Sequence, residues 1–307
     1  MPPVIHVDHL CHRYGNRYIY KDLNFSISPG KIYGLLGKNG VGKTTLIKIL
    51  MGFLRPVSGT CKVFNEPSHA LTPDARARIG LLFEGHVAYE FLSICQIEKF
   101  YAPFYPDWDT GIYYRMVDKL NLRPNHLIRQ MSCGQRSQVV LGLLMAQQPE
   151  LLLLDDYSIG LDAGYRRLFL DEMREYSGQG NRTVFLTSHV IQDMEDFVDE
   201  VIFLERGGRL MVTSLEQFKN SFTCFRLPVS TNNDTPGISQ SITREQMLSA
   251  CPMLKNIEIH HDHWDLFTFS SGRKLADALN HINMPGNLLE PVDLSLEDAF
   301  IGYTGRY

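Results

Sequence analysis

The sequence lacks the paired cysteines and the long apolar runs that mark several classes of protein. Its six cysteines form no CxxC pair and are spread along the chain, which disfavours a zinc site or a disulfide framework and indicates a reducing compartment. The longest apolar runs, Val139 to Ala146 and Leu151 to Leu154, fall far short of the roughly 18 residues needed to cross a membrane. We therefore expect neither a signal peptide nor a membrane-spanning segment.

The sequence also lacks an excess of charge of either sign. Lys and Arg number 30, Asp and Glu number 34, and no block of like charge occurs, which argues against nucleic acid as a partner. Glycine (24) and proline (15) are near average and 44% of the residues are hydrophobic, which excludes collagen-like and disordered chains. A length of 307 residues allows about two domains.

Strand and helix patterns alternate over the first two thirds of the chain. A helical pattern follows the glycine-rich stretch 37–42, and a second helical region, rich in aromatics, covers about 85–148. Strands alternating with helices predict a mostly parallel sheet. The expected strands are Ile5 to Leu10, Leu23 to Ile27, Lys31 to Leu36, Leu151 to Leu154 and Thr183 to Leu186.

The pattern changes beyond about Ser214. A polar, turn-rich stretch covers Ser230 to Gly237, and apolar alternation from Ile257 to Phe269 predicts a strand pair that turns near Asp262 and His263. We therefore expect one domain over 1–214, with a helical subdomain at about 85–150, and a small domain over 215–307.

The strongest motif is GKNGVGKTT, which matches the phosphate-binding pattern GxxxxGK[ST] and stands between a predicted strand and a predicted helix. Glycines let backbone N–H groups face phosphate oxygens, Lys43 reaches the β- and γ-phosphates, and Thr44 can ligate Mg²⁺. The candidate nucleotide-binding residues are Gly37, Lys38, Asn39, Gly40, Val41, Gly42, Lys43, Thr44 and Thr45.

A second nucleotide element follows the buried strand Leu151 to Leu154. Asp155 stands at the end of that strand, where its carboxylate can hold Mg²⁺ beside the phosphate loop. Many phosphate-loop proteins carry both elements and use them for unrelated purposes, so these two motifs alone leave the function open.

A third motif narrows the class. Met131 to Arg136, MSCGQR, precedes a predicted helix and resembles the LSGGQ signature of ATP-binding-cassette (ABC) ATPases. A serine and a glycine at a helix N-terminus form an anion site. The resemblance implies that Ser132, Gly134 and Gln135 contact the γ-phosphate of an ATP held by a second cassette.

Other landmarks of the family follow in order, so that the resemblance covers about residues 4–212. Tyr14 is similar to the aromatic that stacks on adenine, although it could be a strand aromatic like Tyr18 and Tyr20. Asp162, in the stretch SIGLD, resembles the D-loop residue at the dimer interface. His189, after a buried strand, resembles the switch histidine that contacts the γ-phosphate.

Three positions depart from the family pattern. Asp156 stands where a glutamate usually polarises the attacking water; it is one methylene shorter, which predicts slow hydrolysis. Glu84 replaces the Q-loop glutamine, so that it could offer an oxygen to Mg²⁺ but also brings negative charge towards the phosphates. Cys133 occupies a glycine position of the signature, where a side chain hinders close approach of phosphate.

The resemblance implies an α/β fold: a RecA-like P-loop ABC cassette with an inserted helical subdomain, followed by a small α+β domain. The implied function is the ATP-hydrolysing motor of an ABC transporter, with ATP and Mg²⁺ as ligands. The implied partners are a second cassette, identical or different, and an integral membrane permease. The chain would lie in the cytoplasm, at the inner face of the membrane.

Two stretches resemble a narrower subgroup. Ser295 to Phe300, SLEDAF, looks like the ending of bacterial exporter ATPases that have a short C-terminal extension. Phe104 to Asp109, FYPDWD, is similar to a stretch in cassettes of peptide-antibiotic resistance and cell-envelope response, although such aromatics could also be core residues of the helical subdomain. Together they favour export.

Two other functions are considered. An ATP-switched regulatory cassette, with dimerisation as its output, is favoured by Asp156 and Glu84. A soluble cassette of translation or DNA repair is disfavoured, because the chain has one phosphate loop and no long coiled coil.

The histidines at 260, 261 and 263 are candidate metal ligands. Strict strand alternation would put His261 and His263 on one face and His260 on the other, and no Cys or third ligand has a typical spacing. The sequence therefore predicts a solvated hairpin rather than a metal site.

Overall fold

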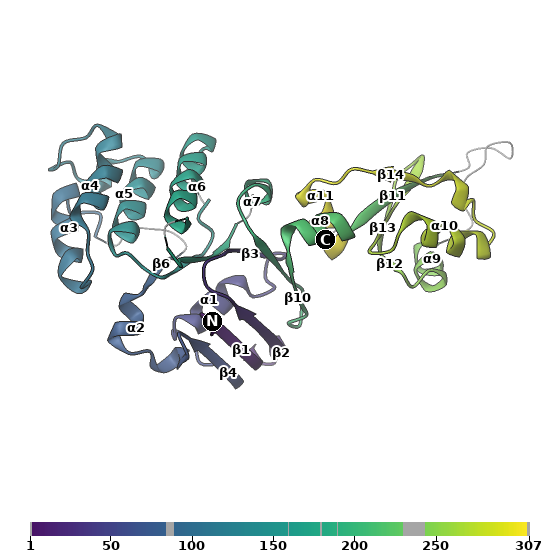
Figure 1. Ribbon diagram of the computed structural model, residues 1–307, viewed down its shortest axis with the longest axis horizontal. Helices are drawn as coiled ribbons and strands as arrows, with labels where there is room; N and C mark the ends of the chain where they lie inside the picture. The colour runs from purple at the N-terminus through teal and green to yellow at the C-terminus, as the bar shows by residue number, and fades with distance from the viewer. Residues whose placement is uncertain are drawn as a thin grey trace. The chain divides into compact units, whose positions relative to one another are not determined.

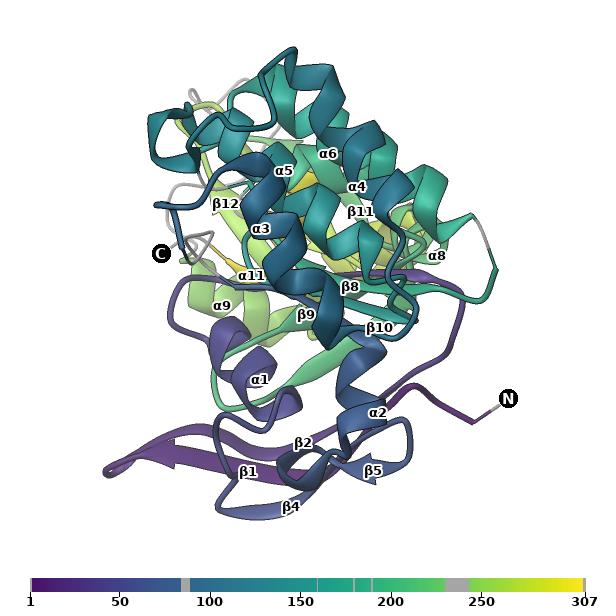
Figure 2. The ribbon, with the colours of Figure 1, turned by 90° about the vertical axis from the view of Figure 1, so that its left-hand side faces the viewer.

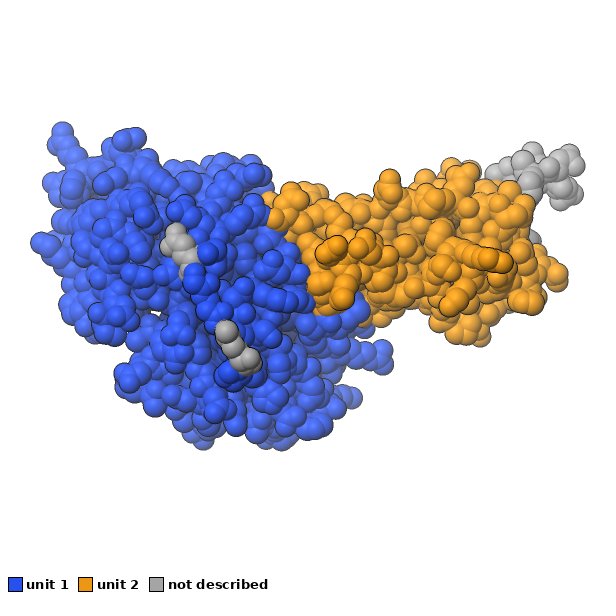
Figure 3. Space-filling view, viewed as in Figure 1, with its two compact units in different colours: residues 1–190, 197–212 blue, residues 191–196, 213–307 orange. Residues whose placement is uncertain are grey.

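The computed structural model describes residues 2–83, 89–158, 160–178, 180–188, 190–229 and 243–305. The chain divides into two compact units, residues 1–190 with 197–212, and residues 191–196 with 213–307 (Figure 3). Segment 191–196 groups with the later residues because Glu195 forms an ion pair with Lys219 (2.7 Å) and accepts a hydrogen bond from the Leu296 N–H (3.3 Å). The sequence alone does not reveal that residues 191–196 belong to the second unit although residues of the first unit flank them.

The first unit is built on a sheet in the order β10-β9-β3-β8-β7-β6, in which the neighbours from β9 to β6 run parallel. Every residue of β3, β7 and β8 is buried, because the sheet is covered on both faces. This confirms the predicted mostly parallel sheet. The strands are β3 Ile32–Leu36, β6 Ile79–Leu82, β7 Leu151–Leu154, β8 Thr183–Thr187, β9 Glu200–Leu204 and β10 Leu210–Ser214.

A second, antiparallel sheet has the order β2-β1-β4-β5. Its core-facing side packs on helix α1, which lies between the two sheets (Figure 2). The first two strands are longer than predicted, because their pairing continues through polar residues to the turn that joins Tyr14 to Arg17. The elements are β1 Ile5–Tyr14, β2 Arg17–Ile27, α1 Lys43–Leu50, β4 Ser58–Val63 and β5 Glu66–Pro67.

Helices α3, α4 and α5 gather in a layer with an apolar cluster of its own (Figure 1). Within it the buried Tyr113 donates its hydroxyl proton to the Ile94 carbonyl (2.8 Å), and Trp108 donates to Glu98 (3.0 Å). Part of the aromatic stretch at 104–109 therefore serves the packing of this layer. The helices of the first unit are α1, α2 Pro73–Ala77, α3 Ile94–Tyr101, α4 Thr110–Val117, α5 Cys133–Ala146 and α6 Ala163–Ser177, with short 3-10 turns at Ser68–Ala70, Ala102–Phe104, Asp118–Leu120 and Ile128–Gln130.

The C-terminal unit is an α+β structure, as predicted. Its sheet has the order β12-β13-β11-β14, and one face packs on α9 and α10 through residues such as Leu227, Ile257 and Leu266. Within the described ranges, no helix of either unit is both long and apolar enough to span a bilayer. The elements are α7 Gln192–Glu195, α8 Leu215–Ser221, β11 Thr223–Pro228, α9 Arg244–Ala250, β12 Leu254–Ile259, β13 His263–Thr268, α10 Gly272–His281, a 3-10 turn Gly286–Leu288, β14 Glu290–Val292 and α11 Leu296–Thr304.

The predicted placement of the three histidines is wrong. Strands β12 and β13 are joined by a short turn, and the His260 N–H donates to the His263 carbonyl (2.9 Å). His260 and His263 are therefore cross-strand neighbours on one face, whereas His261 lies exposed in the turn. Alternation holds along one strand but not across a turn, which is why the sequence pattern misassigned the faces.

Candidate functional site

The phosphate loop connects the end of β3 to the start of α1. Gly40 has a φ of 76° and Gly42 a φ of 118°, conformations that favour glycine. Gly42 is also the N-cap of α1, so the turn that aims the loop N–H groups depends on it. The predicted position of this loop, between a strand and a helix, is the one observed.

Strand β2 contacts the phosphate loop at Gly42. The fully buried Tyr20 donates its hydroxyl proton to the Gly42 carbonyl, and a Cβ atom added at Gly42 would come within 2.5 Å of Ile19 Cγ2. Tyr20 had no assigned role in the sequence pattern. Its periodicity signalled only a strand, and its contact with the loop spans 22 positions of the chain.

Lys43 curls back over the loop. Its Nζ donates to the Gly37 carbonyl (2.5 Å) and to the Lys38 carbonyl (3.4 Å). Burial lowers the pKa of this ammonium group, and the charges of Asp156 and Asp155 oppose the shift. The ammonium group is thus held, largely desolvated, near two carboxylates and at the mouth of the loop.

Asp155 and Asp156 follow β7 and are joined to the end of β8. The Thr187 hydroxyl donates to the buried Asp155 carboxylate (3.1 Å) and accepts from the Asp156 N–H (2.8 Å). The ends of parallel strands meet at one edge of a sheet, which is where these groups assemble. Thr187 is a site residue that the sequence reasoning missed, since an isolated threonine carries no motif.

Asp156 has a left-handed backbone with a φ of 52°, which is uncommon for residues other than glycine and tolerated best by Asn and Asp. Its carboxylate accepts a hydrogen bond from the Ser158 hydroxyl (3.2 Å). Such outliers are frequent at functional sites, because surrounding contacts hold the residue in place.

Six of the nine predicted phosphate-loop residues line one cleft of about 430 Å³ with Asp155 and Asp156, whereas Gly37, Lys38 and Val41 do not line it. Tyr14 lines the cleft and is 49% exposed as a residue, so its ring is available for stacking. Arg17, another residue missed from the sequence, donates to the Gly40 carbonyl (3.4 Å). The lining is Tyr14, Arg17, Ile19, Asn39, Gly40, Gly42, Lys43, Thr44, Thr45, Asp155, Asp156 and Thr187.

The signature residues do not line this cleft. Ser132 is the exposed N-cap of α5 and forms a capping box with Gln135. Gly134 is buried where a Cβ atom would come within 2.1 Å of the Tyr165 ring, so close packing of α5 requires glycine here. Asp162 is exposed and caps α6 through the Tyr165 N–H (3.0 Å).

Two predicted site residues, Glu84 and His189, lie outside the described residues. The strands that precede them, β6 and β8, end at the same edge of the sheet as β3 and β7.

The fold and this cleft define a P-loop nucleoside-triphosphatase. Residues 20–158 match the sequence model of the family described as ABC transporter. The match spans 139 of the 307 residues, and over this stretch the chain is similar to the ATP-binding subunits of ABC transporters.

Curated relatives and a solved structure show the same similarity. The chain is 27% identical, over 70% of its length and 70% of the relative, to the uncharacterized ABC transporter ATP-binding protein YdbJ of Bacillus subtilis. It is 25% identical to the Nod factor export ATP-binding protein I of Cupriavidus metallidurans, over 68% of this chain and 71% of that protein. A solved ATP-binding subunit of an ABC transporter shares the fold, with a TM-score of 0.63 and 22% identity over 71% of this chain and 92% of that one.

Proposed function

We propose that this ATPase hydrolyses Mg²⁺-ATP between two head-to-tail cassettes and so drives an exporter permease in the membrane. The observation that carries the proposal is the convergence of Lys43, Asp155 and Asp156 in one cleft, while Ser132 lies outside it. Because the signature residues of this chain lie outside its own cleft, the nucleotide site would be complete only when a second cassette supplies its signature residues.

Each residue of the cleft would have a separate role in the in-line attack of water on the γ-phosphate. Lys43 and the loop N–H groups would balance charge on the β- and γ-phosphates, and Asp156 would orient the attacking water. Thr44 and Asp155 present oxygen donors in the same cleft, the donor type that Mg²⁺ prefers. Bound there, Mg²⁺ would neutralise phosphate charge. Glu84 and His189 are proposed to act beside them, at the metal and at the γ-phosphate.

The exposed end of α5 suits the opposing site. Ser132 and Gln135 satisfy each other in the capping box, so a phosphate would compete for the Ser132 hydroxyl and for the first N–H groups of the helix. Asp162, also exposed, would lie at the same interface. The partner cassette could be a second copy of this chain or a different one.

The proposed direction of transport, export, is supported by similarity to other proteins. The names of several relatives describe Nod factor export, and the ending from Ser295 to Phe300 resembles exporter ATPases. We further propose the subgroup of peptide-antibiotic resistance and cell-envelope response, and a location at the inner face of the membrane through the permease.

A longer carboxylate at position 156 is expected to speed hydrolysis. We predict that Asp156→Glu raises the steady-state turnover of Mg²⁺-ATP by about tenfold or more, because a displacement of about 1 Å can cost on the order of 10²-fold in rate. Asp156→Asn, which keeps the shape and removes the base, should lower turnover instead. Equal or slower turnover in Asp156→Glu would contradict the prediction of a misplaced water.

The second candidate function, an ATP-operated switch, is favoured by the same Asp156. Sizing chromatography with ATP, combined with turnover of the purified chain, separates the two. A motor is expected to form ATP-dependent dimers that dissociate as ATP is consumed. Dimers that persist for hours with intact ATP would favour the switch, and a chain that stays monomeric and inactive at all ATP concentrations would contradict a homodimeric site.

A further inference from the structure

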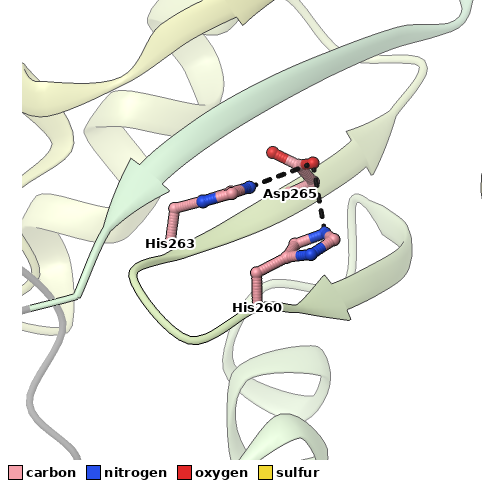
Figure 4. A group of neighbouring side chains, drawn as sticks. All are labelled: His260, His263 and Asp265. Carbon is pink, nitrogen blue, oxygen red and sulfur yellow. Dashed lines mark ion pairs between the residues drawn. The ribbon is translucent and has the colours of Figure 1, made fainter.

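The hairpin of the C-terminal unit brings together side chains that the ATPase does not use. His260 and His263 face each other across the turn, and Asp265 stands two positions further along β13 on the same face (Figure 4). Cα pairing sets Arg226 of β11 opposite Asp265. Strands β11 and β13 and the turn after β12 thus contribute to one polar cluster on the sheet face opposite Leu227 and Leu266.

The two distances from Asp265 to the histidines suit a tetrahedral metal ion. Asp265 Oδ2 lies 3.4 Å from His260 Nε2 and 3.6 Å from His263 Nε2, and all three potential ligand atoms lie within 4.8 Å of one another. Tetrahedral ligands held roughly 2.0 to 2.2 Å from a metal are separated by roughly 3.3 to 3.6 Å. The two imidazole rings stack with centroids 4.4 Å and planes 17° apart, so at least one ring must tilt for the in-plane lone pairs of both Nε2 atoms to meet one ion.

Among the described residues, neither of these nitrogens has a hydrogen-bond partner. Nε2 of His260 and Nε2 of His263 are buried from solvent, and neither makes a hydrogen bond within the described part of the chain. Buried polar atoms are rarely left in this state, because it forfeits the hydrogen bonds they made with water. An ion bound between them would satisfy both.

A hydrogen bond to a neighbouring carboxylate fixes which nitrogen of His263 is available to a cation. Nδ1 of His263 lies 2.7 Å from Asp262 Oδ1, and since a carboxylate only accepts, Nδ1 carries the proton. The lone pair of the neutral ring is then on Nε2, which faces Asp265. Hydrogen bonds from ligating histidines to carboxylates are the usual second layer of zinc sites.

Arg226 fixes the third ligand. Its guanidinium donates to Asp265 Oδ1 (2.9 Å) and Oδ2 (3.1 Å), which orients the carboxylate towards the histidines. With neutral histidines, the charges of Asp262, Asp265 and Arg226 leave one net negative charge. Two imidazoles and one carboxylate suit zinc-like divalent ions better than Mg²⁺ or Ca²⁺, which prefer all-oxygen sites.

We propose that His260, His263 and Asp265 form a binding site for a zinc-class divalent metal ion, with a fourth position open to water or another ligand. The site belongs to the C-terminal unit and is independent of the proposed ATP chemistry.

The proposal is tested by Zn²⁺ titration of the full chain, prepared without a histidine tag and stripped by a chelator, against a chromophoric zinc indicator. His260→Gln and His263→Gln are each expected to remove one equivalent of bound Zn²⁺, or to weaken it by at least about 100-fold. Asp262→Ala should weaken it by about tenfold, because it removes the outer hydrogen bond. His261→Gln, in the same turn but outside the cluster, is the matched control and should bind as the wild type does.

Thermal unfolding supplies the second measurement. Zn²⁺ should raise the unfolding midpoint of the wild type and of His261→Gln, but not that of His260→Gln or His263→Gln, whose metal-free midpoints show whether they fold. Titrations of His260→Gln and His263→Gln that match the wild type would overturn the proposal. Wild-type protein that binds no Zn²⁺ and whose unfolding midpoint does not respond to Zn²⁺ would also overturn it.

Discussion

Lys43→Ala is expected to lower ATP turnover by at least about 10²-fold, the scale of loss when one charge-stabilising donor is removed from a transition state. The ammonium group is largely desolvated and stands near Asp155 and Asp156, so its removal takes a positive charge out of the centre of the cleft. Binding of ATP should weaken as well, because the β- and γ-phosphates lose their nearest cation. Turnover by a coupled phosphate assay and affinity for a fluorescent ATP analogue measure the two effects.

The control for this variant is Lys99→Ala, which removes an exposed lysine of α3 outside the cleft. It should retain wild-type turnover. The midpoint of thermal unfolding without nucleotide should change little in Lys43→Ala, because the buried ammonium group opposes folding as much as its hydrogen bonds favour it. Turnover above about a tenth of the wild-type value in Lys43→Ala would contradict the assignment of this cleft as the catalytic site.

Gly42→Ala is expected to damage both the fold and the site. The φ of 118° is strained for alanine, and the new Cβ atom would lie 2.5 Å from Ile19 Cγ2 and from the Tyr20 hydroxyl oxygen. Strain together with overpacking should cost about 3 kcal/mol of unfolding free energy. Relief of the overlap would move the loop, so ATP affinity should fall by at least about 100-fold.

Gly40→Ala is the matched control, two residues earlier in the same loop. Its φ is 76°, but the nearest atom to an added Cβ is Arg17 Nη2 at 3.9 Å, so only backbone strain of about 1 kcal/mol applies. Chemical denaturation without nucleotide compares the two variants. Equal destabilisation by Gly40→Ala and Gly42→Ala would show that the contact with β2 does not constrain the loop.

The elements that the sequence predicted well are those with local causes. Strand β7 is four leucines, a pattern that only a strand buried on both faces explains in this context, and its bounds were predicted without error. The phosphate loop and α1 were predicted because glycine spacing, Lys43 and the following apolar period are all local. The residue types that form this part of the site stand within nine positions of one another.

The parts that escaped prediction depend on contacts distant in the chain. Tyr20 and Thr187 reach the site across 22 and 31 positions, and neither carries a motif that would mark it. The histidine cluster escaped for a different reason, since the residues are close in sequence but their faces depend on the length of the turn between β12 and β13. A shift of one residue in that turn would have separated His260 from His263.

The shared hydroxyl of Thr187 has a mechanical consequence. Because it bonds to the carboxylate of Asp155 and to the backbone of Asp156 at once, the ends of β7 and β8 are fastened to each other and cannot slide independently. This edge of the sheet therefore keeps a fixed geometry. In the proposed mechanism, the displacement that accompanies ATP hydrolysis would therefore be taken up by the connecting loops and by the helical layer of α3, α4 and α5.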